Sequence, residues 1–148
     1  MHRHIVPDIV SNQTLVTLAP QTTVREAAKL MTERKIGAIM VVESGRLVGI
    51  FSERDVLGRV VARGLDPDKT SLRDTMTANP ITVAPDDPPA AALELMAQRG
   101  FRHLPVVEGE RIVGMVSIRD LYAAIKVELE EEVQERESFI FGSNYGVA

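Results

Sequence analysis

The sequence predicts a mixed α/β (α+β) fold in which one strand–helix–strand–strand–helix unit (βαββα) occurs twice, followed by an extended C-terminal helix and tail. The first observation is a repeated heptad: Gly-Ile-Phe-Ser-Glu-Arg-Asp at residues 49–55 returns as Gly-Met-Val-Ser-Ile-Arg-Asp at residues 114–120. The second is that the stretches around each heptad also match, at an offset of about 65 residues. With 148 residues, 45% of them hydrophobic, the chain can form one compact domain or two small halves that share a core.

Each unit is expected to begin with a short strand that a proline ends. Leu-Val-Thr-Leu-Ala-Pro at residues 15–20 matches Pro-Ile-Thr-Val-Ala-Pro at residues 80–85. Asp-Ile-Val-Ser at residues 8–11 precedes the first strand, as Asp-Thr-Met-Thr at residues 74–77 precedes the second. This earlier pair is offset by about 66 residues, so one residue is gained or lost before the rest of the unit.

A helix should follow each of these strands, and a hairpin should follow each helix. Thr23 with Glu26 forms a helix start signal. The counterpart helix is expected to start at Asp86 or Asp87, with Pro88 in its first turn. Gly37 and Gly100 lie near the expected helix exits, where glycine is favoured. The expected hairpins pair residues 38–42 with 46–51 and residues 104–107 with 111–116, and Pro105 indicates an edge or a break.

Each heptad is expected to end a buried strand and to begin a helix, because an apolar run precedes it and a helical pattern follows it. Ser52 with Asp55, and Ser117 with Asp120, then fall on the first helical turn. Such a pair resembles a capping box, which needs no ligand. Free N–H groups and the helix dipole also make this turn attractive to anions. A cap alone does not require the arginine that both heptads share.

The last stretch, residues 128–148, is expected to continue the second helix with a solvated acidic face and to end in an apolar tail. The aromatic residues of this tail, Phe139, Phe141 and Tyr145, are expected to dock on the protein's own fold or on a neighbour. The expected divisions are a first repeat at 5–64, a linker at 65–70, a second repeat at 71–127 and the extension at 128–148.

Together with Arg-His-Leu-Pro-Val-Val at residues 102–107, the two heptads resemble the CBS domain, named after cystathionine β-synthase, present as a tandem pair over residues 5–127. The resemblance implies a pseudo-twofold axis and two clefts between the repeats. It also implies that adenosine-containing ligands bind there: AMP, ADP, ATP, NAD or S-adenosylmethionine. In that family the motif aspartate accepts hydrogen bonds from ribose hydroxyls, which suits an ionised carboxylate, the motif serine approaches ribose and phosphate, and backbone groups of the other repeat read the adenine.

Carried across by position, the resemblance assigns one cleft to each heptad. The residues of the Asp120 cleft are Ser117, Arg119 and Asp120 with Val16, Thr17, Ile36, Gly37 and Ala38. The residues of the Asp55 cleft are Ser52, Arg54 and Asp55 with Ile81, Thr82, Phe101, Arg102 and His103. The motif arginine is compatible with phosphate binding, and the alternative is a solvent-facing arginine on the first turn.

The two clefts are expected to differ. Gly37 and Ala38 leave room for a base beside the backbone of the Asp120 cleft. Arg102 and His103 suit phosphate better than adenine, and they could reach phosphates that extend from the other cleft. His103 carries charge only when protonated, which happens near neutrality if its environment leaves it unperturbed. The alternative is that Arg102 is a surface charge and His103 a satisfied core histidine.

A regulatory or sensor module that binds AMP, ADP, ATP or NAD without catalysis is the expected function. The sequence has no cysteine and no P-loop, and its three histidines form no triad or metal cluster, so neither an enzyme nor a metal cofactor is expected. The alternative function is a structural dimerisation or protein-interaction module whose clefts hold no physiological nucleotide.

The expected partners are a second copy of the chain, in a homodimer, and an unidentified effector protein for signal transduction. A net charge of −4 argues against nucleic-acid binding. No apolar run approaches the roughly 20 residues of a membrane helix. The absence of cysteine suits a cytoplasmic location.

Overall fold

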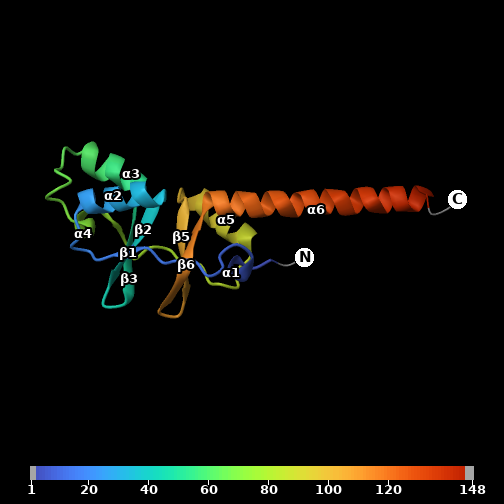
Figure 1. Cartoon of the computed structure of the whole chain (residues 1–148), viewed down its shortest axis with the longest axis horizontal. Helices are drawn as coiled ribbons and strands as arrows, with labels where there is room; N and C mark the ends of the chain where they lie inside the picture. Colours follow the sequence, from blue (N-terminus) through green and yellow to red (C-terminus); the bar gives the residue numbers. More distant parts are fainter. Residues whose placement is uncertain (1–2, 146–148) are drawn as a thin grey trace.

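Two antiparallel hairpins, one from each repeat, lie side by side (Figure 1). The structure is a computed structural model that describes residues 3–145, with side chains described for residues 3–140. The first hairpin pairs β2 (Ala38–Glu43) with β3 (Arg46–Ser52), and the second pairs β5 (His103–Glu108) with β6 (Arg111–Ser117). Both have the same register and a bulge at the same place. The expected hairpins are therefore confirmed.

The strands that precede the helices are shorter than expected. β1 is only Thr17–Leu18 and pairs in parallel with β2, while β4 (Thr77–Ala78) pairs antiparallel with β3. In the second repeat the expected strand at 80–85 is wrong, because Val83 forms only an isolated bridge to Val106. Prolines at both ends of that stretch have no N–H to donate, so the ladder cannot extend.

The helices begin and end close to the expected residues. α2 (Val24–Arg34) starts after Thr23, whose hydroxyl accepts the N–H of Glu26 at 3.2 Å. α5 (Pro89–Arg99) starts later than expected, because the Asp87 carboxylate accepts the N–H of Ala84 instead of capping the helix. Gly100 ends α5 in a left-handed conformation as expected, but Lys35, not Gly37, does so for α2.

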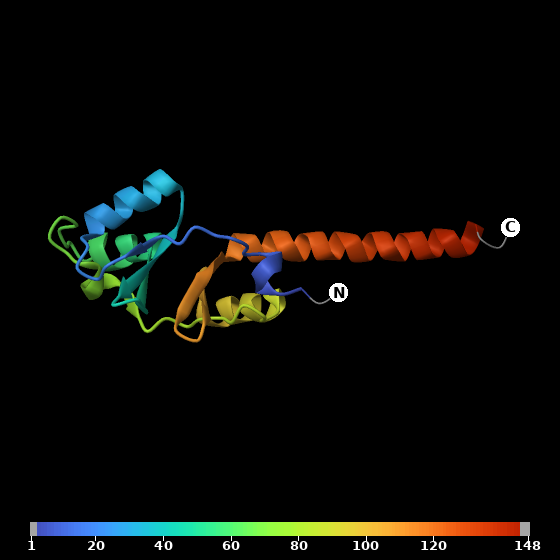
Figure 2. The ribbon, with the colours of Figure 1, turned by 60° about the horizontal axis from the view of Figure 1, so that its bottom comes forward.

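Both heptads turn from strand into helix as expected. The first continues as α3 (Glu53–Asp55) and a π-helical segment, η1 (Val56–Val61). The second begins α6 (Ile118–Tyr145), which projects away from the rest of the chain in both ribbon views (Figures 1 and 2). No helix among residues 3–145 is both long and apolar enough to cross a membrane.

The expected docking of the tail on its own fold is wrong for the part whose side chains are described. Residues 138–145 continue α6 as helix, and the side chains of Phe139 and Ile140 are 77% and 55% exposed. The side chains of Phe141 and Tyr145, and residues 146–148 altogether, lie outside the described part of the chain. Helix continuation satisfies the backbone hydrogen bonds without any tertiary contact.

The segments that precede the two repeats are exchanged between two hydrophobic cores. α1 (Ile5–Asp8) and Val10 pack with the core of the second repeat, around Leu104 and Leu121. α4 (Leu72–Thr75) and Met76 pack with the core of the first repeat, around Phe51. Figure 1 shows α1 beside the second hairpin and α4 beside α2. Each half is therefore completed by a segment that precedes the other.

The glycine that opens each heptad is explained by this exchange. A Cβ on Gly114 would lie 2.8 Å from Cγ1 of Val10, and a Cβ on Gly49 would overlap the side chain of Met76. Val10 and Met76 occupy equivalent positions before the two repeats. The motif glycine thus lets the preceding segment approach the strand closely.

Candidate functional site

Two cavities lie where the repeats meet, one at each heptad. The cavity of the Asp55 cleft has a volume of about 290 Å³, and that of the Asp120 cleft about 830 Å³. Small-molecule sites usually measure about 300–1,000 Å³. Only the Asp120 cavity lies well within that range.

The structure brings most of the expected site residues to these cavities. The expected residues that line the Asp55 cavity are Ser52, Arg54, Asp55, Ile81, Phe101, Arg102 and His103. Those that line the Asp120 cavity are Ser117, Arg119, Asp120, Ile36 and Gly37.

Four expected residues do not line their cavities: Val16, Thr17, Ala38 and Thr82. Ala38 is fully buried in β2, and Val16 packs against the core of the first repeat. Thr17 is paired with β2 through β1. Burial thus holds Ala38 and Val16 behind the cavity wall, whereas Thr17 and Thr82 are exposed and lie outside the two cavities.

Gln13 also lines the Asp120 cavity, and no motif in the sequence predicts it there. Its side-chain carbonyl accepts the N–H of Met115 at 2.7 Å, and its amide donates to the Met115 carbonyl at 3.1 Å. In the first repeat the equivalent edge of β3 is paired with the backbone of β4. A side chain that substitutes for a strand leaves no periodic signal in the sequence.

The serine and aspartate of each heptad form a capping box in both repeats. Asp55 Oδ2 accepts the N–H of Ser52 at 2.8 Å, and Asp120 Oδ2 accepts the N–H of Ser117 at 3.1 Å. In return, the serine oxygens accept the aspartate N–H groups at 3.4 and 3.1 Å. The capping interpretation is therefore confirmed in its geometry, and a role in ligand binding must use what remains free on each carboxylate.

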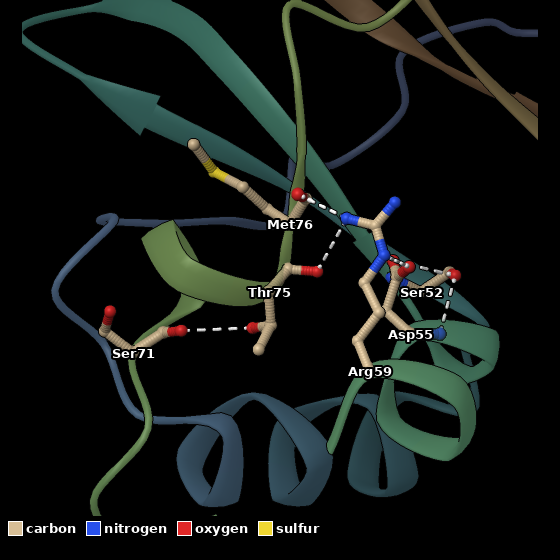
Figure 3. Close-up of polar contacts among 6 residues, drawn as sticks. All are labelled: Ser52, Asp55, Arg59, Ser71, Thr75 and Met76. Carbon is tan, nitrogen blue, oxygen red and sulfur yellow. Dashed lines mark hydrogen bonds and ion pairs between the residues drawn. The ribbon is translucent and has the colours of Figure 1, made fainter. Parts of the chain in front are cut away.

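Arg59 distinguishes the two aspartates (Figure 3). Its Nε lies 3.4 Å from Asp55 Oδ1, and its Nη1 donates to the carbonyls of Met76 and Thr75 at 2.7 and 3.2 Å. The Asp55 side chain is only 13% exposed. The residue four positions after Asp120 is Ala124, so the second repeat has no equivalent cation there.

The two motif arginines also differ. Arg54 Nη1 donates to the carbonyl of Gly100 at 3.0 Å, at the C-terminal end of α5, where a cation is favourable. It therefore connects the first repeat to the second. Arg119 is exposed at the Asp120 cavity.

Gly37 and His103 line both cavities. A Cβ on Gly37 would lie 3.2 Å from Cε1 of His103, so the glycine makes room for the imidazole. Burial lowers the pKa of His103 from its usual value of 6.5; Arg102 acts in the same direction, while Glu53 and Asp120 oppose the shift. Burial disfavours the charged imidazole, which favours the interpretation of His103 as a core histidine over that of a phosphate-binding cation.

The chain was compared with known proteins. The model of the CBS domain matches it twice, over residues 6–62 and 72–127. The mitochondrial CBS domain-containing protein CBSX3 of Arabidopsis thaliana is 38% identical over 125 residues, which cover 81% of this chain and 61% of that protein. The chain spans about a fifth of the next two curated relatives, 20% and 21% of their length.

Solved structures of CBS domain proteins also superpose on the chain. A putative signal-transduction protein with CBS domains from Burkholderia ambifaria superposes with a TM-score of 0.79 at 31% identity, covering 83% of this chain and 93% of that one. A CBS domain protein from Pyrobaculum aerophilum, complexed with AMP, superposes with a TM-score of 0.67 at 34% identity, covering 74% and 84%.

Proposed function

The chain belongs to the CBS domain family, as a tandem pair of repeats, and from this we propose that it is a non-catalytic regulatory module that binds an adenosine nucleotide (AMP, ADP, ATP or NAD) between the repeats. The observation that carries the proposal is the Asp120 cleft. There, an exposed carboxylate from the second repeat and a side-chain-free position, Gly37, from the first face one cavity of about 830 Å³.

The chemistry of the Asp120 cleft fits a nucleoside phosphate. Asp120 Oδ2 is held by the Ser117 N–H, which orients the carboxylate and leaves Oδ1 to accept ribose hydroxyl groups. Ile36 offers an apolar side chain to the base. Arg119, at the N-terminus of α6, adds a cation where the helix dipole also favours a phosphate.

The similarity to the AMP complex from Pyrobaculum aerophilum supports the same ligand class. The test is thermal unfolding of the full chain with AMP, ADP, ATP, NAD and, as a control, adenosine. A nucleotide that binds the native state must raise the melting temperature by mass action. Calorimetry on the best ligand and mass spectrometry of the purified protein complete the test. No stabilisation by any of the four nucleotides, with none co-purifying, would refute the proposal.

We also propose a homodimer in which a second copy covers the apolar face of α6. Tyr122, Leu129, Val133 and Ile140 are each more than half exposed, and their spacing of seven and four residues places them on one face of the helix. Three of them, Tyr122, Leu129 and Val133, border an apolar groove together with Leu93 of α5. Such a stripe is unfavourable in water, and burying it would stabilise an assembly.

We propose that the module acts in the cytoplasm and that an effector protein binds it differently with and without nucleotide. The alternative function, a structural dimerisation module without a nucleotide, is favoured by the α6 stripe alone. Light scattering combined with the thermal assay separates the two functions. A dimer whose melting temperature does not respond to any nucleotide supports the structural dimerisation module. A monomer at micromolar concentration contradicts both the proposed homodimer and the structural dimerisation module.

A further inference from the structure

We propose that the protein binds one nucleotide per chain, in the Asp120 cleft, because Arg59 occupies the carboxylate that a second nucleotide would need in the Asp55 cleft. The inference rests on the proposed function and adds its stoichiometry and the residue that determines it. Residue 59 follows Asp55 by four positions and residue 124 follows Asp120 by four, so the two repeats can be compared directly.

The Asp55 carboxylate is already engaged at both oxygens. Oδ2 accepts the N–H of Ser52 at 2.8 Å and its hydroxyl at 3.1 Å, and Oδ1 faces Arg59 Nε at 3.4 Å. A ribose diol would have to take Oδ1 from the guanidinium. With 13% of its side chain exposed, Asp55 also offers a diol little access from the cavity.

Arg59 is not free to leave. Its Nη1 donates to the carbonyls of Thr75 and Met76, which end α4. These carbonyls have no partner within so short a helix. The arginine therefore joins the heptad of the first repeat to the exchanged segment before the second, as Figure 3 shows. Moving it would break the ion pair and both hydrogen bonds together.

The Asp120 cleft lacks this obstacle. Ala124 carries no charge and cannot reach Asp120, whose side chain is exposed. Its cavity is about 830 Å³ against about 290 Å³ at Asp55. The smaller cavity lies just below the lower end of the usual range for small-molecule sites, so space and chemistry favour the same cleft.

The first experiment is titration of the full chain with AMP in a calorimeter. One AMP per chain is expected, and Asp120→Asn should weaken its binding at least tenfold. Two equivalent AMP per chain, or one AMP that Asp120→Asn leaves unaffected, would overturn the inference while leaving the proposed function intact. No AMP binding, together with no response to ADP, ATP or NAD, would refute the proposed function and this inference with it.

The second experiment transfers the arginine to the other repeat. Ala124→Arg should bring a guanidinium to Asp120 and weaken AMP binding at least tenfold. Ala124→Gln, which adds a long side chain without the charge, is the matched control and should bind within threefold of the wild type. Equal loss in both variants would show that bulk and not the ion pair excludes the ribose, and no loss in the folded Ala124→Arg protein would overturn the role given to Arg59.

Discussion

Asp55 and Asp120 occupy the same position in the two heptads, so replacing each by alanine compares a capping carboxylate that is also ion-paired with one that is not. Asp55 accepts two hydrogen bonds from Ser52 and faces Arg59, with 13% of its side chain exposed. Asp120 accepts the N–H of Ser117 from an exposed position, where water can replace it. In the absence of nucleotide, Asp55→Ala should therefore destabilise the protein more than Asp120→Ala.

The magnitude follows from these contacts. A lost hydrogen bond to a charged group costs about 1.5–3 kcal/mol, and a partly exposed ion pair adds about 0.5–1 kcal/mol. Asp55→Ala should thus cost about 2–4 kcal/mol. An exposed cap is worth about 1 kcal/mol or less, so Asp120→Ala should cost about that. At about 2–4 °C per kcal/mol for a chain of this size, the melting temperature should fall by about 4–16 °C in Asp55→Ala and by less than about 4 °C in Asp120→Ala.

Urea unfolding followed by circular dichroism measures both values, with wild type and Arg59→Gln as references. Arg59→Gln removes the ion pair and weakens the contacts to the α4 carbonyls, so its loss should be comparable with that of Asp55→Ala. The double variant should lose less than the sum, because the two residues share one interaction. Equal losses in the two aspartate variants would refute the reasoning, since the Arg59 contacts would then contribute nothing measurable.

Three further predictions concern other contacts. Gly114→Ala should cost about 1–3 kcal/mol, because the added Cβ would overlap Gln13 Oε1 and Val10 Cγ1. Val10→Ala in the same chain should recover part of that cost, and strictly additive losses in urea unfolding would contradict the close approach of Val10. Because burial lowers the pKa of His103, the unfolded chain binds a proton near pH 6.5 more readily than the folded chain. The free energy of unfolding should therefore fall as the pH drops from 7.5 through 6.5, and His103→Gln should flatten that fall. An unchanged pH profile in the variant would argue against the shift. A chain ending at residue 137 should dimerise more weakly by light scattering, because it loses exposed Phe139 and Ile140; an equally stable dimer would contradict the contact proposed for the end of α6.

Much of the fold was predictable because it occurs twice. Hairpins, their registers and the strand-to-helix turns repeat at one offset, and each copy supports the interpretation of the other. The strand expected at 80–85 was not predictable from its match to 15–20, because pairing depends on backbone donors that its prolines lack. The helical conformation of residues 138–145 was also not predicted, because the apolar and aromatic composition of this stretch does not distinguish a docked tail from a continued helix.

The motif residues of the candidate site could be predicted from the sequence, but several other residues expected to line the cavities could not. The heptads and the stretch around His103 reach the cavities, whereas Ala38 and Thr17 are held in the sheet. Arg59 and Ala124 can be compared in the sequence alone. The difference has meaning only in the structure, where the carbonyls at the end of α4 accept hydrogen bonds from Arg59 and hold it beside Asp55.

The exchange of segments has a consequence for how the protein is made. Ile5 and Val10 leave the ribosome long before Leu121, yet Leu121 belongs to the core that receives them. Before Leu121 is available, the segment around Ile5 and Val10 has no core to pack against. Its docking closes a long loop of chain, and the contacts of the second core must offset the entropy of that loop closure. The final assembly of the pair is thus deferred until the second repeat has been synthesised, and a chain that stops before it exposes apolar residues that only the missing half can cover. A single repeat expressed alone would lack the exchanged segment that completes its hydrophobic core.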